Sequence, residues 1–422
     1  FRPRRKAMAF SPGRRIIFLL PVLVFLALAA VIGKPDELRT QIVKAFIVLN
    51  SGYQPSDELA QNIRDFVRTR LSAHEYPREI ADKMAELGLF GITISSDYGG
   101  LGLSAVTFAR IVEEIAAVWM SVGGIIGSHL IMARMVERFG SDEMKQAYLP
   151  KFASGELRGG IALTEPDAGT DLQGIRMRAA REGDEYVING SKMWITNAMM
   201  GNILAVLVKT DPKAEPAHKG MSLLLVPRDA GYVPSKLEKL GYRGIDTCGI
   251  EFCDVRVRAA NLIGGEEGRG LQQTLNAIEL GRINVAARGT GIARACLEES
   301  LAYAQTRQTF GKPIAEHQTI QIKLADMATR VEAARLLTEQ AARVFDEGRR
   351  SDLEAGMAKL FATEAAMENS AEAMRIHGAY GYSTEFNIER YYRDAPLLVI
   401  GEGTNELQRL IIARQLVEKY PV

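Results

Sequence analysis

The chain has 422 residues, and its 52 basic residues almost balance its 51 acidic ones, which leaves a formal net charge of +1. This balance gives no electrostatic basis for nucleic acid as the main partner, so a small ligand is expected. The cysteines Cys248, Cys253 and Cys296 form no CxxC pair, and the histidines show no metal-ligand spacing. A disulfide framework and a metal site are therefore not expected. The length favours two or three domains.

The first 50 residues are separated from the fold. Residues 16–33 carry no charge and follow a basic stretch, a pattern typical of a signal peptide or a membrane anchor. The chain opens on Phe1, and Met8 is its first methionine. Two interpretations stay open: a fragmentary or misread start, or a genuine targeting or anchoring segment that brings the protein to a membrane.

Residues 51–158 predict an N-terminal helical domain. Within residues 56–71 the apolar side chains recur near a period of 3.6, and Ser56 is well placed as an N-cap. The loop at residues 95–102 interrupts the helical pattern, because its paired glycines permit a tight turn.

Residues 159–270 predict a central β domain. Short runs rich in β-forming residues are bounded by Gly, Pro and Asp, and no helix-length segment separates them. An antiparallel sheet or a small barrel is therefore expected. The pair Asn189 and Gly190 is a hairpin signal within this region.

Residues 271–422 predict a C-terminal four-helix bundle, because the helical segments are long and their connections are short. One buried face is marked by apolar residues at intervals of three and four, namely Ile320, Leu324, Met327, Val331 and Ala334.

Two segments of the β domain carry candidate ligand contacts. Thr164, Gly169 and Thr170 surround a turn, which either offers hydroxyl and N–H groups to an acceptor-rich ligand or is a plain β-turn. Trp194, beside Thr196, either covers a flat heteroaromatic ring or packs within the sheet, which is the commoner arrangement for tryptophan.

Two segments of the helical region have features of a dinucleotide-binding loop or of a phosphate contact. The string RGTGIAR at 288–294 lies within a helical run, lacks a third glycine and has no strand-helix-strand unit around it, so it is rejected as a dinucleotide loop. The connection at residues 307–318 either meets a phosphate or simply closes the loop between two helices.

Glu402 stands between Gly401 and Gly403 after an apolar run. Taken alone, it is interpreted as a solvated loop carboxylate before a helix capped by Thr404 or Asn405. The apolar flank favours a second interpretation. A partly buried carboxylate without a cationic neighbour has a raised pKa and is suited to proton abstraction.

From about residue 55 to the C-terminus, the chain resembles the acyl-CoA dehydrogenase family in the order and spacing of its motifs. Six strings support the resemblance: LTEPDAGTD, INGSKMWITNA, RQTFGKPIAEHQ, RIHGAYGYSTEF, YRDA and EGTNELQR. The resemblance implies an α+β multidomain fold with an N-terminal helical domain, a central antiparallel β domain and a C-terminal four-helix bundle. It also implies a homotetramer with FAD between the β domain and the bundle.

The matching positions imply which residues meet FAD and substrate. The FAD residues are Leu163, Thr164, Gly169, Thr170, Trp194, Thr196, Arg307, Gln308, Phe310, Gln318, His377, Gly378, Gly381, Thr404 and Glu406. Those from Arg307 to Gln318 would reach the FAD of a neighbouring subunit. The substrate residues are Thr170, Arg282, Gly401 and Gly403.

The resemblance implies α,β-dehydrogenation of an acyl-CoA thioester to the trans-2-enoyl-CoA. Glu402 would remove the α-proton while hydride leaves Cβ for flavin N5, and an electron-transfer flavoprotein would receive the electrons. Some members place the base where this chain has Gly281, which cannot serve. Glu279 points roughly 200° around the helix from that position, so it is not expected to substitute.

Three features depart from the family pattern. The connection before Pro77 is short, which predicts a truncated first helical hairpin. Gly401 stands where many members carry tyrosine, so we hypothesise that a branched or substituted acyl chain fits, as in fatty acid or branched-chain catabolism. The apolar segment at 16–33 conflicts with the bacterial cytoplasm or mitochondrial matrix expected of the family.

Two alternatives complete the sequence-based expectations. The first is an acyl-CoA oxidase or a flavin monooxygenase on the same fold; the monooxygenase branch generally lacks the base, so Glu402 argues against it. The second is a non-enzymatic, membrane-anchored helical protein, which would bind no flavin.

Overall fold

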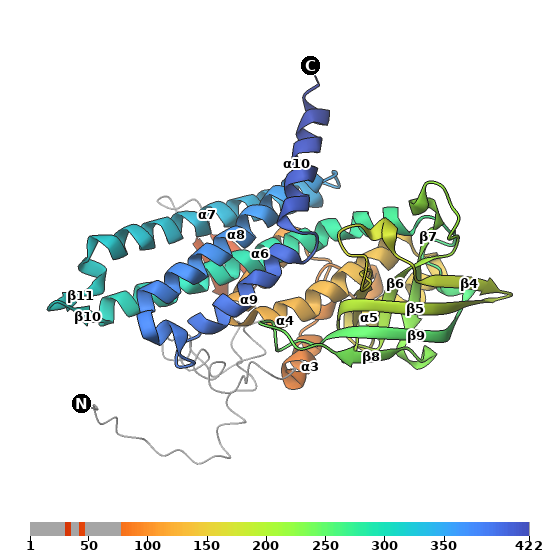
Figure 1. The fold of residues 1–422 in the computed structure, drawn as a ribbon, viewed down its shortest axis with the longest axis horizontal. Coiled ribbons are helices and arrows are strands. Elements are labelled where there is room, and N and C mark those ends of the chain that lie inside the picture. The colour runs from red at the N-terminus through yellow and green to blue at the C-terminus, as the bar shows by residue number, and fades with distance from the viewer. Residues whose placement is uncertain (1–29, 35–41, 47–76, 422) are drawn as a thin grey trace, which may run out of the picture.

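The computed structural model describes residues 30–34, 42–46 and 77–421. Strands β1 (Ala30–Lys34) and β2 (Ile42–Phe46) form an antiparallel pair. Most of the apolar segment at 16–33, the helix expected over residues 56–71 and the short connection before Pro77 lie outside the described residues. For the remainder, Figure 1 shows the predicted succession of helices, sheet and helices.

The N-terminal helices are α3 (Arg78–Glu86), α4 (Ala105–Phe139) and α5 (Asp142–Ser154). Helix α4 begins at a proper cap, where the hydroxyl of Ser104 accepts from the N–H of Thr107. Its course is kinked at Trp119, which has extended backbone angles of −158° and 104°. Within the described ranges, α4 alone has the length and hydropathy of a membrane span, yet 78% of its most apolar window is buried inside the protein, as in a core helix.

A seven-stranded sheet forms the central domain, in the order β3-β6-β4-β5-β9-β8 with β7 paired to β6. The strands are β3 (Gly159–Ala162), β4 (Arg178–Glu182), β5 (Glu185–Thr196), β6 (Ile203–Lys209), β7 (Met221–Pro227), β8 (Val233–Lys236) and β9 (Thr247–Arg258). Most pairings are antiparallel, as predicted, but β6 runs parallel to β3 and to the start of β4.

The hairpin predicted at Asn189 and Gly190 is wrong. Both residues lie inside β5, at a register shift opposite β9, and Gly190 has a φ of 136°. A Cβ at Gly190 would stand 3.0 Å from the Cα of Met177. The glycine therefore permits a bulge and a close backbone approach, and the true hairpin joins Glu182 to Glu185.

The C-terminal helices are α6 (Gly270–Thr306), α7 (Gln318–Asp346), α8 (Asp352–His377), α9 (Ile388–Ile400) and α10 (Asn405–Lys419). A small hairpin, β10 (Gln308–Thr309) and β11 (Lys312–Pro313), joins α6 to α7 at the end of the molecule opposite the sheet (Figure 1). The predicted buried face of α7 is confirmed: Met327, Val331 and Ala334 are buried, and Ile320 and Leu324 pack at its edge.

The glycines of the string at 288–294 belong to helix packing, which confirms that they form no dinucleotide loop. A Cβ at Gly289 would lie 2.7 Å from the carbonyl oxygen of Ala362 on α8. A Cβ at Gly291 would lie 2.5 Å from the carbonyl oxygen of Glu113 on α4. The two glycines therefore let α6 approach both neighbours closely.

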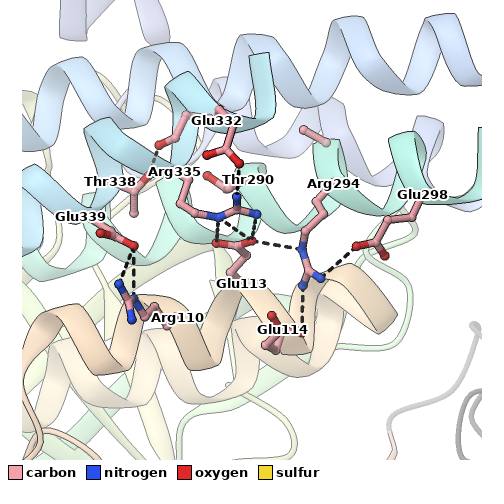
Figure 2. A network of polar contacts seen from close by, with 12 residues as sticks. Arg110, Glu113, Glu114, Thr290, Arg294, Glu298, Glu332, Arg335, Thr338 and Glu339 are labelled. Carbon is pink, nitrogen blue, oxygen red and sulfur yellow. Dashed lines mark hydrogen bonds and ion pairs between the residues drawn. The ribbon is translucent and has the colours of Figure 1, made fainter. Parts of the chain in front are cut away.

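A buried ionic network ties α4 to the bundle (Figure 2). Glu113 of α4 is 7% exposed, and its Oε1 lies 2.8 Å from Arg335 of α7 and 3.0 Å from Arg294 of α6. Arg294 also meets Glu114 at 2.9 Å. One carboxylate thus connects three helices from two parts of the chain.

Candidate active site

A cavity of about 1360 Å³ opens between α4, the sheet, α6, α9 and the loop at residues 401–404. This volume exceeds the roughly 300–1,000 Å³ of common small-ligand pockets, so the cavity has room for more than one small ligand. The sequence-predicted residues that line it are Leu163, Thr164, Gly169, Thr170, Trp194, Thr196, Arg282, Gly401, Glu402, Gly403 and Thr404.

Glu402 lies at the kink between α9 and α10. Its φ of 55° is in the left-handed region, which non-glycine residues seldom adopt outside functional or strained sites. The carboxylate turns toward α6, where a Cβ built on Gly281 would stand 3.1 Å from its Oε2. The two base positions implied by the family resemblance therefore face each other across one small space.

Electrostatics at Glu402 combine burial with nearby cations. Burial raises the pKa of the Glu402 carboxyl above its ordinary value, and Arg288, Arg282 and Lys359 oppose that rise, in this order of strength. The sequence-based premise that this carboxylate has no cationic neighbour is wrong, although the expected direction of the pKa shift holds. The cations come from α6 and α8, which the sequence places far from Glu402.

Lys359 of α8 holds the backbone around Glu402. Its Nζ donates to the carbonyl oxygens of Gly403 at 2.8 Å and Val399 at 3.3 Å, and to Asn405 Oδ1 at 2.7 Å. Burial lowers the pKa of Lys359 to about 8. Thr404 is the cap of α10, since its hydroxyl accepts from the N–H of Leu407 at 3.3 Å.

Two polar residues of α6 bond to the start of α8. Arg282 Nη1 lies 3.0 Å from Asp352 Oδ1 while its side chain lines the cavity. Glu279 Oε2 accepts from the N–H of Ser351 at 3.1 Å and from its hydroxyl at 2.7 Å. Glu279 is thus engaged away from the cavity, which fits the expectation that it does not replace Glu402.

A buried ion pair shapes the sheet side of the cavity. Lys192 Nζ donates to Glu165 Oε1 at 2.9 Å and to the carbonyl oxygen of Leu163 at 2.8 Å. Glu165 also accepts from the N–H groups of Arg176 and Met177 at 2.6 and 3.0 Å. Together these bonds fix the strand end that presents Leu163 to the cavity.

Trp194 is not packed inside the sheet. Its backbone is left-handed, with a φ of 64°, and its side chain is 59% exposed at the cavity wall. The indole is therefore free to lie against a flat ring, the first of the two interpretations given to it above.

A second group of predicted FAD residues lies at the far end of the bundle. Arg307, Gln308 and Phe310 belong to the α6–α7 connection, and Gln318 begins α7. Phe310 is 96% exposed. Arg307 follows Arg282 by 25 residues along the chain, which corresponds to about 37 Å at ~1.5 Å per helical residue. Within one chain, these residues do not reach the cavity beside Glu402.

The remaining predicted FAD residues also lie outside this cavity. His377 ends α8, where its Nδ1 bonds the carbonyl oxygen of Ala373 at 2.8 Å and its ring stacks on Tyr303 of α6 at 4.3 Å. Gly378 and Gly381 lie in the short 3-10 turn that follows it. Glu406 is 81% exposed on the first turn of α10. None of these four residues lines the cavity, although Glu406 follows Glu402 by only four residues.

Several cavity residues were missed from the sequence: Tyr242, Asn284, Arg288, and the supporting Lys359 and Asp394. Asp394 Oδ1 accepts from the N–H of Tyr242 at 2.6 Å, which seats the loop before β9 on α9. The available signal was helical spacing, because Asn284 and Arg288 follow Gly281 by one and two turns.

Comparison with known proteins agrees with this architecture. The chain matches three family descriptions: acyl-CoA dehydrogenase N-terminal domain over residues 55–156, middle domain over 160–255 and C-terminal domain over 268–417. It is 42% identical over 367 residues to a probable acyl-CoA dehydrogenase, YngJ, of Bacillus subtilis, which covers 84% of this chain and 96% of that protein.

A human relative and a solved structure extend the comparison. The chain is 39% identical over 373 residues to the mitochondrial short-chain specific acyl-CoA dehydrogenase of Homo sapiens, covering 86% of this chain and 90% of the relative. A chain in a structure titled for the electron transferring flavoprotein of Acidaminococcus fermentans superimposes with a TM-score of 0.82 at 32% identity, covering 97% of this chain and 100% of that one. The chain belongs to the acyl-CoA dehydrogenase family.

Proposed function

We propose that this chain is an FAD-dependent dehydrogenase that converts an acyl-CoA thioester to its trans-2-enoyl-CoA, with Glu402 as the base. The observation that carries the proposal is the placement of Glu402, whose backbone is left-handed and whose half-buried carboxylate turns toward α6 at the wall of a large cavity. Burial raises the pKa of Glu402, and a base with a raised pKa removes protons from carbon more readily.

The thioester carbonyl needs a donor while the α-proton leaves, because negative charge develops on its oxygen. Helix α9 ends at Ile400 and α10 begins at Asn405, so the N–H of Glu402 lies outside helical hydrogen bonding. We assign this N–H to the carbonyl oxygen. The Glu402 carboxylate would then take the proton from the adjacent carbon, and the N–H and the carboxylate of one residue would act on neighbouring substrate atoms.

The cavity fits FAD in size and in the flat, exposed indole of Trp194 at its wall. When bound, FAD accepts the hydride that leaves Cβ. Leu163, Thr164, Thr170 and Thr196 would hold it on the sheet side. The residues at the far end of α6, from Arg307 to Gln318, would instead hold the FAD of a neighbouring copy in a homotetramer, because they lie far from the Glu402 cavity.

Electrons would leave through an electron-transfer flavoprotein. This part of the proposal is supported by the family and by the TM-score of 0.82 to a chain in a structure titled for such a flavoprotein. The competing acceptor is molecular oxygen, as in an acyl-CoA oxidase. Oxygen consumption without an added acceptor, at the rate of thioester turnover, would favour the oxidase.

Gly401 supports the hypothesis of a branched or substituted acyl chain. A Cβ at this position would meet only the carbonyl oxygen of Leu397, at 3.3 Å, so the glycine leaves space beside Glu402. The human relative is named for short chains, so a short acyl chain is the starting point. Faster turnover of straight-chain C4 to C8 thioesters than of branched ones would refute the branched-chain part.

The proposed location of the protein is the bacterial cytoplasm or the mitochondrial matrix, where acyl-CoA is available. Its proposed role is in the catabolism of fatty acids or branched-chain acids. Membrane association through residues 16–33 is tested separately. The chain from Lys34 onward and the full chain would be compared by membrane fractionation. Equal distribution of both would argue against an anchor.

The decisive experiment is anaerobic bleaching of the bound flavin by a panel of acyl-CoA esters. We expect Glu402→Gln to retain its yellow FAD yet to bleach about 10² to 10⁴ times more slowly than the wild type, since proton abstraction loses its base. Glu418→Gln, at a 59% exposed position near the end of α10, is the matched control and should bleach normally. Normal bleaching by Glu402→Gln would remove Glu402 from the mechanism.

A further inference from the structure

Two buried polar side chains of α6 line the cavity on the side of α4. Asn284 and Arg288 lie one helical turn apart, and they follow Gly281, the residue that faces the Glu402 carboxylate. Helical side chains lean toward the N-terminus of their helix, so both lean back toward the level of Glu402. Polar groups therefore stand where an acyl chain would continue beyond its reacting carbons.

Both side chains keep an unpaired donor. Arg288 is 7% exposed, and its Nη1 donates to the hydroxyl of Tyr242 at 3.0 Å, but its Nε has no hydrogen-bond partner among the described residues. Asn284 is 2% exposed, and its Nδ2 likewise lacks a partner there. Unpaired buried donors are unfavourable and uncommon in folded proteins, so two of them on one cavity wall indicate an absent acceptor.

The opposite helix makes room for these groups. A Cβ at Gly127 of α4 would stand 2.5 Å from Asn284 Oδ1, and a Cβ at Gly124 would stand 1.4 Å from the hydroxyl of Tyr242. Larger residues at these positions would displace the polar side chains. The chain thus has glycines on α4 where Asn284 and Tyr242 need the space.

We propose that the acyl group of the substrate carries a carboxylate at its far end, and that Arg288 and Asn284 bind this carboxylate. The substrate class is then the mono-CoA thioester of a short dicarboxylic acid. This inference rests on the proposed function and leaves its chemistry unchanged, because the terminal carboxylate is bound and does not react. Arg288 and Asn284 are specificity-determining residues in this scheme.

The separation between the Glu402 carboxylate and Arg288 agrees with a short dicarboxylic acid. Arg288 follows Gly281 by seven residues, or about 10 Å along the helix at ~1.5 Å per residue, and the backward lean of the guanidinium shortens this separation. An alkyl chain in the same place would leave both donors desolvated and unpaired. A site built to hydrogen-bond a polar group rejects the analogue that lacks it.

The test compares glutaryl-CoA with valeryl-CoA, which have equal carbon number and differ only in carboxylate against methyl at the far end. The readout is the second-order rate of anaerobic flavin bleaching. For the wild type we expect a glutaryl-to-valeryl ratio above about 10, the effect of a charge-assisted hydrogen bond. Arg288→Leu should lower this ratio about 10- to 100-fold. Arg288→Lys, which keeps a positive charge, should give a ratio between those of the leucine variant and the wild type.

Asn284→Leu is the second variant, and it keeps the test valid if Arg288→Leu fails to fold or to retain flavin. It should also lower the ratio. A wild type that prefers valeryl-CoA, or variants that slow both thioesters equally, would overturn the inference, since equal slowing means that Arg288 only tunes Glu402. If neither these thioesters nor the wider panel bleaches the flavin, the proposed function itself fails.

Discussion

Two adjacent left-handed residues aim the candidate base. Glu402 has a φ of 55° and Gly403 a φ of 85°. A left-handed conformation costs a non-glycine residue roughly 1–2 kcal/mol, so the surrounding contacts must hold it. The bonds from Lys359 to the flanking carbonyls do so, and they direct the carboxylate to the open space over Gly281.

Gly281→Ala should disturb the base without unfolding the protein. The new Cβ would stand 2.8 Å from Ile131 Cδ1 and 3.1 Å from Glu402 Oε2, so one of these groups must shift. We expect flavin bleaching to slow about 10- to 100-fold, because small displacements of reacting groups have effects of this size. Gly356→Ala, on α8, is the control, because its new Cβ would meet nothing closer than 3.4 Å, and it should leave the rate unchanged. Equal rates for the two variants would contradict the argument.

Glu402→Gln should stabilise the protein at neutral pH. Burial places the folded-state pKa of Glu402 above its ordinary value of 4.5, so the folded protein binds this proton more tightly than the unfolded chain. Its contribution is fully present below the unfolded pKa and is lost as pH rises through the folded pKa. Glutamine is neutral at every pH and does not suffer this loss.

The measurement is thermal unfolding of both proteins at pH 7 and near pH 4. We expect the variant to have the higher melting temperature at pH 7. The gain in its free energy of unfolding should be about 1.4 kcal/mol for each unit by which the pKa is raised, and the difference should shrink at the lower pH. A wild type that melts higher at pH 7 would show that the cations around Glu402 outweigh its burial.

At the scale of elements, α8 controls the loop between α9 and α10 through Lys359. Its ammonium donates three hydrogen bonds, one each to the end of α9, to that loop and to the start of α10, and burial lowers its pKa to about 8. Loss of the proton removes one donor and the charge that opposes protonation of Glu402. The loop should therefore hold the base best below this pH.

We expect the rate of flavin bleaching to decline on the alkaline side, with an apparent pKa of about 8, as Lys359 deprotonates. Lys359→Arg keeps its charge at every accessible pH, so its profile should lack this decline even if its maximal rate is lower. Rapid-mixing measurements from pH 6 to 10 would test this. An unchanged alkaline limb in the arginine variant would assign the decline to another group.

The ionic network of Figure 2 gives a stability prediction at the same scale. Glu113→Ala leaves the guanidinium groups of Arg335 and Arg294 without their shared buried partner, so we expect a loss of about 3–5 kcal/mol in the free energy of unfolding. Glu298→Ala, which removes an exposed partner of Arg294, should cost less than about 1 kcal/mol. Denaturant unfolding measures both, and similar costs would refute the role of burial.

The order of elements follows from periodicity, but their close approaches do not. The apolar repeat through Met327 and Val331 located the buried face of α7, because helical spacing is a local property. The polar wall formed by Asn284 and Arg288 depends on which helix lies opposite, which no local pattern encodes. Asn189 and Gly190 show the same limit, since a bulge and a hairpin use the same residues.

At the scale of the whole molecule, the predicted FAD residues fall into two groups at opposite ends of α6. The motif resemblance identified both groups together, because motifs are matched along the chain. Contacts to one cofactor depend instead on which residues are close in three dimensions. Assignment of Arg307 to Gln318 to a neighbouring subunit accounts for the separation, and His377, Gly378 and Gly381 lie at the same far end. The proposed domain limits near residues 158 and 270 stay predictions.

Assembly and cofactor retention should therefore be coupled. Phe310 is 96% exposed on the hairpin between α6 and α7, and Phe310→Asp should lower both the fraction of tetramer and the FAD content. Val233→Asp, at a 64% exposed position of β8, is the control and should change neither. Light scattering and the ratio of absorbance at 450 to 280 nm would be measured together, and an unchanged ratio in the Phe310 variant would oppose the two-subunit site.

The backbone at Gly401 has a consequence for how this enzyme can diversify. Its φ of −70° and ψ of 157° are accessible to every L-amino acid, unlike the angles of its two successors. Exchange of this single codon would change the side chain beside the reacting carbons without a change in backbone strain. A saturation library at this position is therefore the shortest route to new substrate preferences, by laboratory selection or by natural drift.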